Sequence, residues 1–517
     1  MDNRAVVGGT GTPAWVCVGA ALLVGLAFAG ALDNEFVDWD DGPYIVHNPM
    51  VAEPSRYTWL DRLRTANLGY PLPIVVAVYG WVWRWSVDPV AFHTVGLVVH
   101  AANAALVARA ASFEGRWRQG IVAAWAFALH PVVVEAAVWA SGLKDTLMCA
   151  AVLGSFALFP RRPLLGAVLA VLAMGCKPSA SLVGLALLAL AIQRRLSRRA
   201  HGLAAAVLGT GILYAMFVMS TETADLRTSA LVEPSVHRAL GALGLTLEHL
   251  LVPASLSPRY PVAAVGLGSL TLGAFGVAAS AWWGWRSGIR HPTTPWLVLA
   301  WAIYLPVSNL RPLERFTADS YAYVPWAALV LAIVHLQPLR WLKAAVADRW
   351  PHVRAAGLVV GLAWSALTVV QVEVWQSTLA LWRSAMARFP DDGETVYRYG
   401  DALRRRGEAR AELALYLEHL EALSDAPRIP AALLRWYAHH EDHREFRRWA
   451  RLACERPVRQ PDGVYVELLR YLSQFPVQHQ PAYAAALRYA WGRWREGSLE
   501  VSLTAAQQQT LRGLVAQ

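Results

Sequence analysis

Long apolar runs separated by short polar breaks dominate residues 14–374. Most are Ala, Leu, Val and Gly runs close to the length that crosses about 30 Å of hydrocarbon. The pattern therefore predicts about eleven transmembrane helices and an all-α polytopic membrane protein. The predicted spans are 14–32, 90–111, 119–139, 145–160, 163–177, 179–193, 203–220, 262–285, 294–309, 321–337 and 355–374.

Two further apolar segments fit a different position in the membrane. Residues 236–253 contain Arg238, Glu248 and His249, so we expect an interfacial or re-entrant helix on the outer face, where polar groups reach water. Residues 73–86 are short and rich in tryptophan, which is typical of a helix in the headgroup region.

The pattern changes at about residue 376, where apolar runs give way to a charged tail with helical periodicity and several prolines. We expect two domains, 1–375 in the membrane and 376–517 as a separate helical domain. Within the tail, residues 399–416 resemble one tetratricopeptide unit, in which small residues let two antiparallel helices pack closely. The alternative is an unrelated small helical domain.

The arginines orient these spans, because short cytoplasmic loops accumulate Lys and Arg. Basic loops near 116–118, 161–162, 194–199, 286–290 and 340–354 all fall on one side. The N-terminus is therefore expected in the cytoplasm, with the loop at 33–89 and the C-terminal domain outside.

The amino-acid composition agrees with a membrane protein and argues against a typical soluble protein and a nucleic-acid-binding protein. The 517 residues are 56% hydrophobic and only 16% charged, and the net charge of +10 comes mostly from the arginines of these loops. That distribution favours anionic lipid over nucleic acid, since no basic segment is interleaved with aromatic residues. The four cysteines show neither a disulfide framework nor metal-ligand spacing.

An acidic and aromatic cluster follows the first predicted span and contains Trp39, Asp40, Asp41 and Tyr44. A carboxylate pair at a membrane boundary can reach a lipid-borne substrate and still be hydrated, so it is a candidate reaction centre. The alternative is a polar turn that ends the helix. The carboxylates also suit Mg²⁺ or Mn²⁺, although no neighbouring set completes a metal site.

Other polar groups are expected on the same face. His130, Glu135 and Asp145 lie in a segment where Pro131 should bend the helix, and the alternative for Glu135 and His130 is a structural role. Only three lysines occur in the chain, and Lys144 and Lys177 both fall at outer ends of spans.

Two cations at such a boundary could bind a lipid phosphate, or simply reach the headgroups. Arg311 and Arg315 in the last outer loop run against the positive-inside bias, which indicates an anionic partner. That partner is a phosphate, Asp319 or Glu314.

Together these segments resemble the bacterial relatives of the transmembrane and tetratricopeptide repeat O-mannosyltransferases. The resemblance covers nearly the whole chain. Its elements are F-x-x-W-D-D-x-x-Y-x-x-x-N-P at 36–49, Tyr-Pro-Leu at 70–72, Phe-His at 92–93 with His100 and Asn103, H-P-V-V-V-E with W-x-S-G-x-K-D at 130–145, Lys-Pro at 177–178, and S-N-L-x-P with A-D-x-Y-x-Y-x-P at 308–325.

This resemblance implies a GT-C-like bundle, a polyprenyl-phosphate sugar donor and catalysis in the first outer loop. It also implies a multi-pass protein of the bacterial cytoplasmic membrane with the tetratricopeptide-like domain outside. The chain departs from the family at Tyr70, where Arg or His is common, and at Ser320, where Arg is common. The second departure weakens the phosphate-binding scheme, although Arg315 is close enough in sequence to substitute.

We therefore expect an inverting glycosyltransferase in which Asp40 or Asp41, with Asp40 favoured, deprotonates a hydroxyl acceptor. Its acceptor is a protein or a glycan that the C-terminal domain docks, and no nucleic acid partner is expected. The donor phosphate would be bound by Lys144, Lys177, Arg311 and Arg315. The substrate pocket would contain Trp39, Tyr44, Tyr70, His130, Glu135, Asp145, Asp319 and Tyr321. The alternative function is a non-catalytic scaffold that recruits envelope proteins; a transporter is weaker, because no inverted repeat is evident.

Overall fold

The computed structural model describes residues 13–66, 68–112, 116–221, 235–313, 315–336, 350–419, 428–455, 466–471, 488, 490–496 and 504–516. The described residues are helical, with no β-strand among them. The chain divides into two compact units, Met1–Leu381 and Trp382–Gln517, which are treated separately below.

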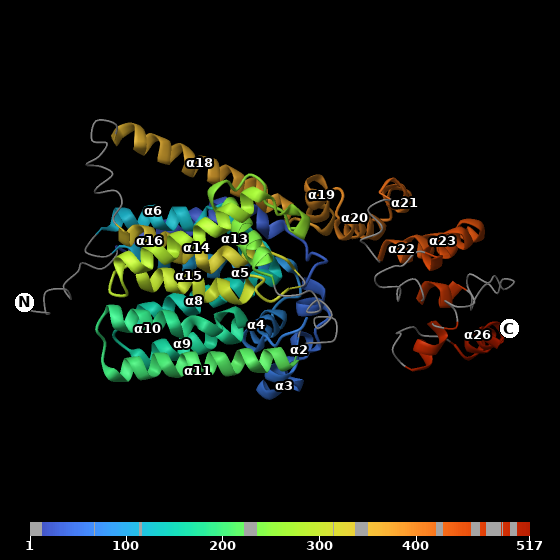
Figure 1. Ribbon diagram of the computed structural model, residues 1–517, viewed down its shortest axis with the longest axis horizontal. Helices are drawn as coiled ribbons and strands as arrows, with labels where there is room; N and C mark the ends of the chain where they lie inside the picture. The colour runs from blue at the N-terminus through green and yellow to red at the C-terminus, as the bar shows by residue number, and fades with distance from the viewer. Residues whose placement is uncertain are drawn as a thin grey trace, which may run out of the picture. The chain divides into compact units, whose positions relative to one another are not determined.

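The first unit is a bundle of apolar helices (Figure 1). Short 3-10 or π segments (η) interrupt it near the polar positions. Its helices are α1 Ala14–Ala27, η1 Ala29–Asp33, η2 Gly42–Val46, α2 Pro49–Ala52, η3 Pro54–Arg56, α3 Trp59–Arg64, α4 Pro73–Trp83, α5 Pro89–Ala111, α6 Trp117–Ala128, η5 Pro131–Val133, α7 Val134–Val138, η6 Ala140–Gly142, α8 Leu143–Leu158, α9 Pro163–Cys176, η7 Pro178–Leu182, α10 Val183–Gln193, α11 Arg198–Thr221, α13 Val236–Leu251, η8 Val262–Ala264, α14 Leu267–Ser287, α15 Thr294–Tyr304, η9 Leu305–Val307, η10 Asp319–Ala322, α16 Tyr323–Leu336 and α18 Trp350–Val374.

Four stretches among the described residues are long and apolar enough to cross a membrane: Pro89–Ala111, Arg198–Ser220, Asp319–Leu336 and Pro351–Val374. A fifth results if α6 and the η5–α7 segment form one span bent by 59°. Several predicted spans change helix type or are interrupted; for example, residues 179–193 begin in the 3-10 segment η7 and continue directly into α10. These helices support a membrane protein, while the count of eleven stays a prediction.

The bend after α6 lies where Pro131 predicted it. The helix ends at Ala128, and the chain restarts in η5 with Pro131 at the first helical position. A proline has no backbone N–H to donate to the preceding turn, so the helix cannot continue through it. The restart directs Glu135 of α7 towards the polar centre described below.

Close glycine packing fixes α13 against α14. A Cβ added to Gly244 would lie only 1.6 Å from the carbonyl oxygen of Ser269, and one added to Gly273 would lie 2.1 Å from that of Leu240. Small residues at both crossings let the two backbones touch, as in other helix pairs of membrane proteins. With 16 residues, α13 is shorter than the long spans.

The second unit consists of consecutive packed helices. Its described helices are α20 Gly393–Arg405, α21 Ala409–Glu418, α22 Arg428–His439, α23 His443–Glu455 and α26 Ala505–Ala516, and α19 Thr378–Arg388 leads into it. Gly400 faces the Tyr416 ring, and Tyr416 donates a hydrogen bond to the carbonyl of Tyr397, so α20 and α21 form a tight pair. The assignment of a tetratricopeptide unit stays a prediction.

Candidate active site

The acidic loop between η1 and α2 is anchored by Asp41. Its carboxylate accepts hydrogen bonds from the backbone N–H of Ser141 and of Val37, both at 2.9 Å, and from the Ser141 hydroxyl. Asp41 is only 1% exposed. This acid therefore fixes the loop to η6 and is poorly placed to meet a substrate.

Burial raises the pKa of Asp41 from 3.8 to about 7, and the hydrogen bonds from Ser141 and Val37 offset only part of this rise. Between these two values the folded protein binds a proton that the unfolded chain has already released. Folding stability should therefore fall as the pH rises from about 4 to about 7 and then level off. We expect thermal unfolding of the Asp41→Asn protein to show a flatter pH dependence across that range. Equal slopes for the two proteins would contradict the assignment.

Asp40 has a different environment from its neighbour. Its side chain is 23% exposed, and one carboxylate oxygen lies 3.3 Å from the ammonium nitrogen of Lys144. The Lys144 nitrogen also lies 4.6 Å from the centre of the Tyr44 ring and 4.5 Å from that of Trp139. Lys144 thus joins the acidic loop to the start of α8 through one ion pair and two cation–π contacts.

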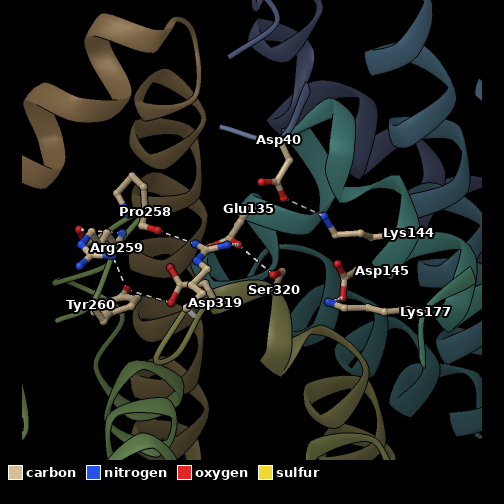
Figure 2. A network of polar contacts seen from close by, with 12 residues as sticks. Asp40, Glu135, Lys144, Asp145, Lys177, Pro258, Arg259, Tyr260, Asp319 and Ser320 are labelled. Atoms are coloured by element: carbon tan, nitrogen blue, oxygen red, sulfur yellow. Dashed lines mark hydrogen bonds and ion pairs between the residues drawn. The ribbon is translucent and has the colours of Figure 1, made fainter. Parts of the chain in front are cut away.

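A second lysine–carboxylate pair lies beside the first. The nitrogen of Lys177, at the end of α9, donates to Asp145 at 2.6 Å and lies 5.0 Å from the centre of the Tyr321 ring. Figure 2 shows the two pairs following one another from Asp40 to Lys177. Tyr44, whose ring contacts Lys144, also shares a side-chain hydrogen bond with Tyr70.

A third pair joins the last outer loop to α7. The guanidinium of Arg315 donates two hydrogen bonds to Glu135, at 2.7 and 3.1 Å, and another to the carbonyl of Pro258. The guanidinium carbon of Arg315 also lies 5.2 Å from the centre of the Trp39 ring. Ser320 donates to the same carboxylate at 2.8 Å. This serine therefore adds a third hydrogen bond to the carboxylate that Arg315 contacts.

Asp319 is the fifth carboxylate of this region. It accepts a hydrogen bond from the hydroxyl of Tyr260 at 2.9 Å, and the ring nitrogen Nδ1 of His249 lies 3.5 Å away. Tyr260 and His249 were not predicted as site residues. The signal in the sequence is that His249 is a polar residue within the largely apolar segment 236–253. Ser141 was a second omission, although it lies in the quoted motif at 130–145.

Two predicted residues lie apart from these contacts. His130 caps η5 by accepting a hydrogen bond from Val132, and its ring packs against Trp326 and Trp364. These contacts agree with the structural role that is the alternative for His130. Arg311 is half-exposed on the same loop as Arg315, but the ion pair with Glu135 is made by Arg315. Glu314 lies outside the described residues.

The charges of this polar network differ from the expected set of cations awaiting phosphate. Lys144, Lys177 and Arg315 each already contact a carboxylate, and two further acids, Asp41 and Asp319, lie in the same region. Phosphate binding therefore requires at least one pair to open. Among the described residues no group of three His, Cys, Asp or Glu side chains is arranged to hold a metal ion.

Polar atoms without partners occur inside the same network. In the described part of the chain, Oδ2 of Asp145 and the indole nitrogen of Trp139 are buried and have no hydrogen-bond partner. Such atoms are rare in folded proteins and commonly bind ordered water, an ion or a ligand. One acceptor and one donor thus lie next to two lysines, which suits a ligand with hydroxyl and phosphate groups.

No protein-family model matches this chain, and neither does any curated protein or any solved structure. The functional inference therefore depends on the residues and on this geometry.

Proposed function

We propose that the protein is a membrane glycosyltransferase that moves a sugar from a polyprenyl-phosphate donor to a hydroxyl acceptor on the extracytoplasmic face. The observation that carries this proposal is the pairing of a partly exposed Asp40 with a buried Lys144, beside the unpartnered atoms of Asp145 and Trp139. A scaffold needs no such cluster. The sequence places the contributing residues on four separate segments, so their convergence favours an enzyme.

Asp40 is the candidate base because it is the more exposed of the two neighbouring acids. It takes the acceptor's O–H proton while the acceptor oxygen bonds to the anomeric carbon and the bond from that carbon to the phosphate oxygen breaks. Attack opposite the phosphate inverts the anomeric centre. The electron pair of the broken bond stays on the leaving polyprenyl phosphate, whose charge Lys144 and Lys177 stabilise.

The Lys144–Asp40 ion pair couples binding of the donor phosphate to release of the base Asp40. A phosphate that approaches Lys144 competes with the carboxylate of Asp40 for the same ammonium group. Once the phosphate is bound, Asp40 is released to accept a proton. The resting protein thus holds its base in a paired state until the donor arrives.

An apolar groove supports a lipid-linked donor. It has a volume of about 600 Å³ and is lined by α13, α14, α15 and part of α10. Ser308 and Leu310 belong to its lining and flank Asn309, whose side chain donates to the carbonyl of Phe316 beside Arg315. The groove therefore continues in sequence into the loop that carries Arg315, which suits a long isoprenoid whose phosphate enters the polar network.

Filling this groove should impair long-chain donors selectively. Ala239 lines it from α13, so Ala239→Phe should lower kcat/KM for a long polyprenyl donor by about 10-fold, the effect of losing roughly 1.4 kcal/mol of binding. A donor with a short chain should react as in the parent protein. The matched control is Leu251→Phe, at an exposed position of the same helix. An equal loss with both donors would contradict this placement of the lipid.

The proposed function itself is tested with purified protein in nanodiscs. Polyprenyl-phosphate hexoses are supplied with membrane extracts as acceptor, and sugar incorporation is followed by mass spectrometry. Transfer that depends on the protein and on Asp40 supports the proposal. Absence of transfer with every donor, while the same protein recruits envelope proteins through residues 382–517, would favour the scaffold.

A further inference from the structure

Four residues that follow α18, Trp375, Gln376, Ser377 and Thr378, form a junction segment that touches both sides of the polar network. Thr378 opens α19, the helix that begins in the first unit and ends in the second. Although the junction follows the acidic loop by more than 300 residues, its contacts are made with that loop.

The junction segment binds the acidic loop through two backbone N–H groups. The N–H of Asp38 donates to the Thr378 hydroxyl at 2.9 Å, and the N–H of Glu35 donates to the carbonyl of Gln376 at 2.9 Å. Asp38 precedes Asp40 by two residues, and Asp41 fixes the loop on its other side to Ser141. Asp40 therefore lies on a short stretch of backbone held at both ends.

The same segment also supports Lys144. Trp375 is 2% exposed, and its ring lies 5.3 Å from that of Trp139 at an interplanar angle of 31°. The Trp139 ring also lies 4.5 Å from the ammonium nitrogen of Lys144. Because the Trp375 ring packs on Trp139, it restricts where the Trp139 ring can lie and therefore where that ring contacts the ammonium group of Lys144.

We propose that Thr378 and Trp375 are positioning residues, which set the places of Asp40 and Lys144 respectively. The junction segment thus positions both members of the Asp40–Lys144 ion pair. The effect of these contacts on catalysis rests on the proposed function, whereas the contacts of Thr378 and Trp375 themselves do not depend on it.

The first test replaces the Thr378 hydroxyl. In full-length protein in nanodiscs, Thr378→Val should raise hydrogen exchange in a peptide covering residues 36–41 by roughly 2- to 10-fold, because the N–H of Asp38 loses its acceptor. Thr378→Ser should restore the parent rate. Ser365→Ala is the matched control, since that hydroxyl lies on α18 and bonds to Trp125 instead. Unchanged exchange in Thr378→Val would overturn the proposal.

The second test separates the two positions by kinetics. Thr378→Val acts on the base and should lower kcat by about the same factor with little change in the donor KM, whereas Trp375→Ala acts on Lys144 and should mainly raise the donor KM. Trp375→Phe should recover the donor KM, since it keeps an aromatic ring against Trp139. Raised exchange in Thr378→Val with an unchanged kcat would overturn the positioning of Asp40. If the parent protein transfers no sugar, the proposed function fails, and the exchange result alone decides whether the junction holds the loop.

Discussion

Asp40→Asn should abolish most sugar transfer, lowering kcat by about 10²- to 10⁴-fold, the usual contribution of a general base. The amide keeps the size of the side chain but cannot accept the acceptor's proton. It also removes the negative charge opposite Lys144, so the donor should bind at least as tightly as in the parent protein. Initial rates at varied donor concentration measure both effects.

Asp33→Asn is the matched control for this substitution. Asp33 lies at the end of η1 on the same loop but is exposed, and its carboxylate makes no contact with the polar network among the described residues. Its loss should leave kcat unchanged. If Asp41→Asn abolished transfer while Asp40→Asn retained it, the base would be Asp41. Full activity in both variants would remove the acidic loop from the mechanism.

Arg315→Met should have the largest effect on stability, about 3–5 kcal/mol. Glu135 is 1% exposed at its side chain and receives two of its three hydrogen bonds from this guanidinium. Without Arg315 a carboxylate is left buried with only the Ser320 hydroxyl. Thermal unfolding in detergent should show a clearly lowered Tm.

A double variant distinguishes a lost partner from a lost contact. Glu135→Gln combined with Arg315→Met removes both charges, and most of the lost Tm should return, because the cost comes from the uncompensated carboxylate. Arg290→Met, at an exposed arginine of another loop, is the control and should change the stability by less than about 0.5 kcal/mol. A double variant that is no more stable than Arg315→Met would show that Arg315 acts through its other contacts, with Pro258 and Trp39.

The sequence predicted the helical class, and several of the residues that it selected lie together in the polar network. The reason is local: apolar run length and residues such as Pro131 act through the chain next to them. The sequence was less successful in predicting which cation pairs with which carboxylate. Lys144, Lys177 and Arg315 were assigned to phosphate because cations at a membrane boundary suggest an anion, but which carboxylate meets which cation depends on tertiary packing.

The two neighbouring aspartates show the same limit. Asp40 and Asp41 have nearly identical sequence contexts, so only the structure separates a partly exposed acid from one buried against Ser141. His130 was assigned to the pocket because of its neighbours in the motif, yet its ring packs between two tryptophans from distant helices. Long-range contacts of this kind leave no local pattern.

The hydrogen bond between Asp38 and Thr378 has a consequence for biosynthesis. The two residues are 340 positions apart in the chain. At about 5–20 residues per second, ribosomes need roughly 17–70 s to make the intervening chain. During that interval the acidic loop has already emerged but lacks one of its anchors. A truncated or stalled chain that ends before residue 378 should therefore insert its early helices yet lack the final form of this loop.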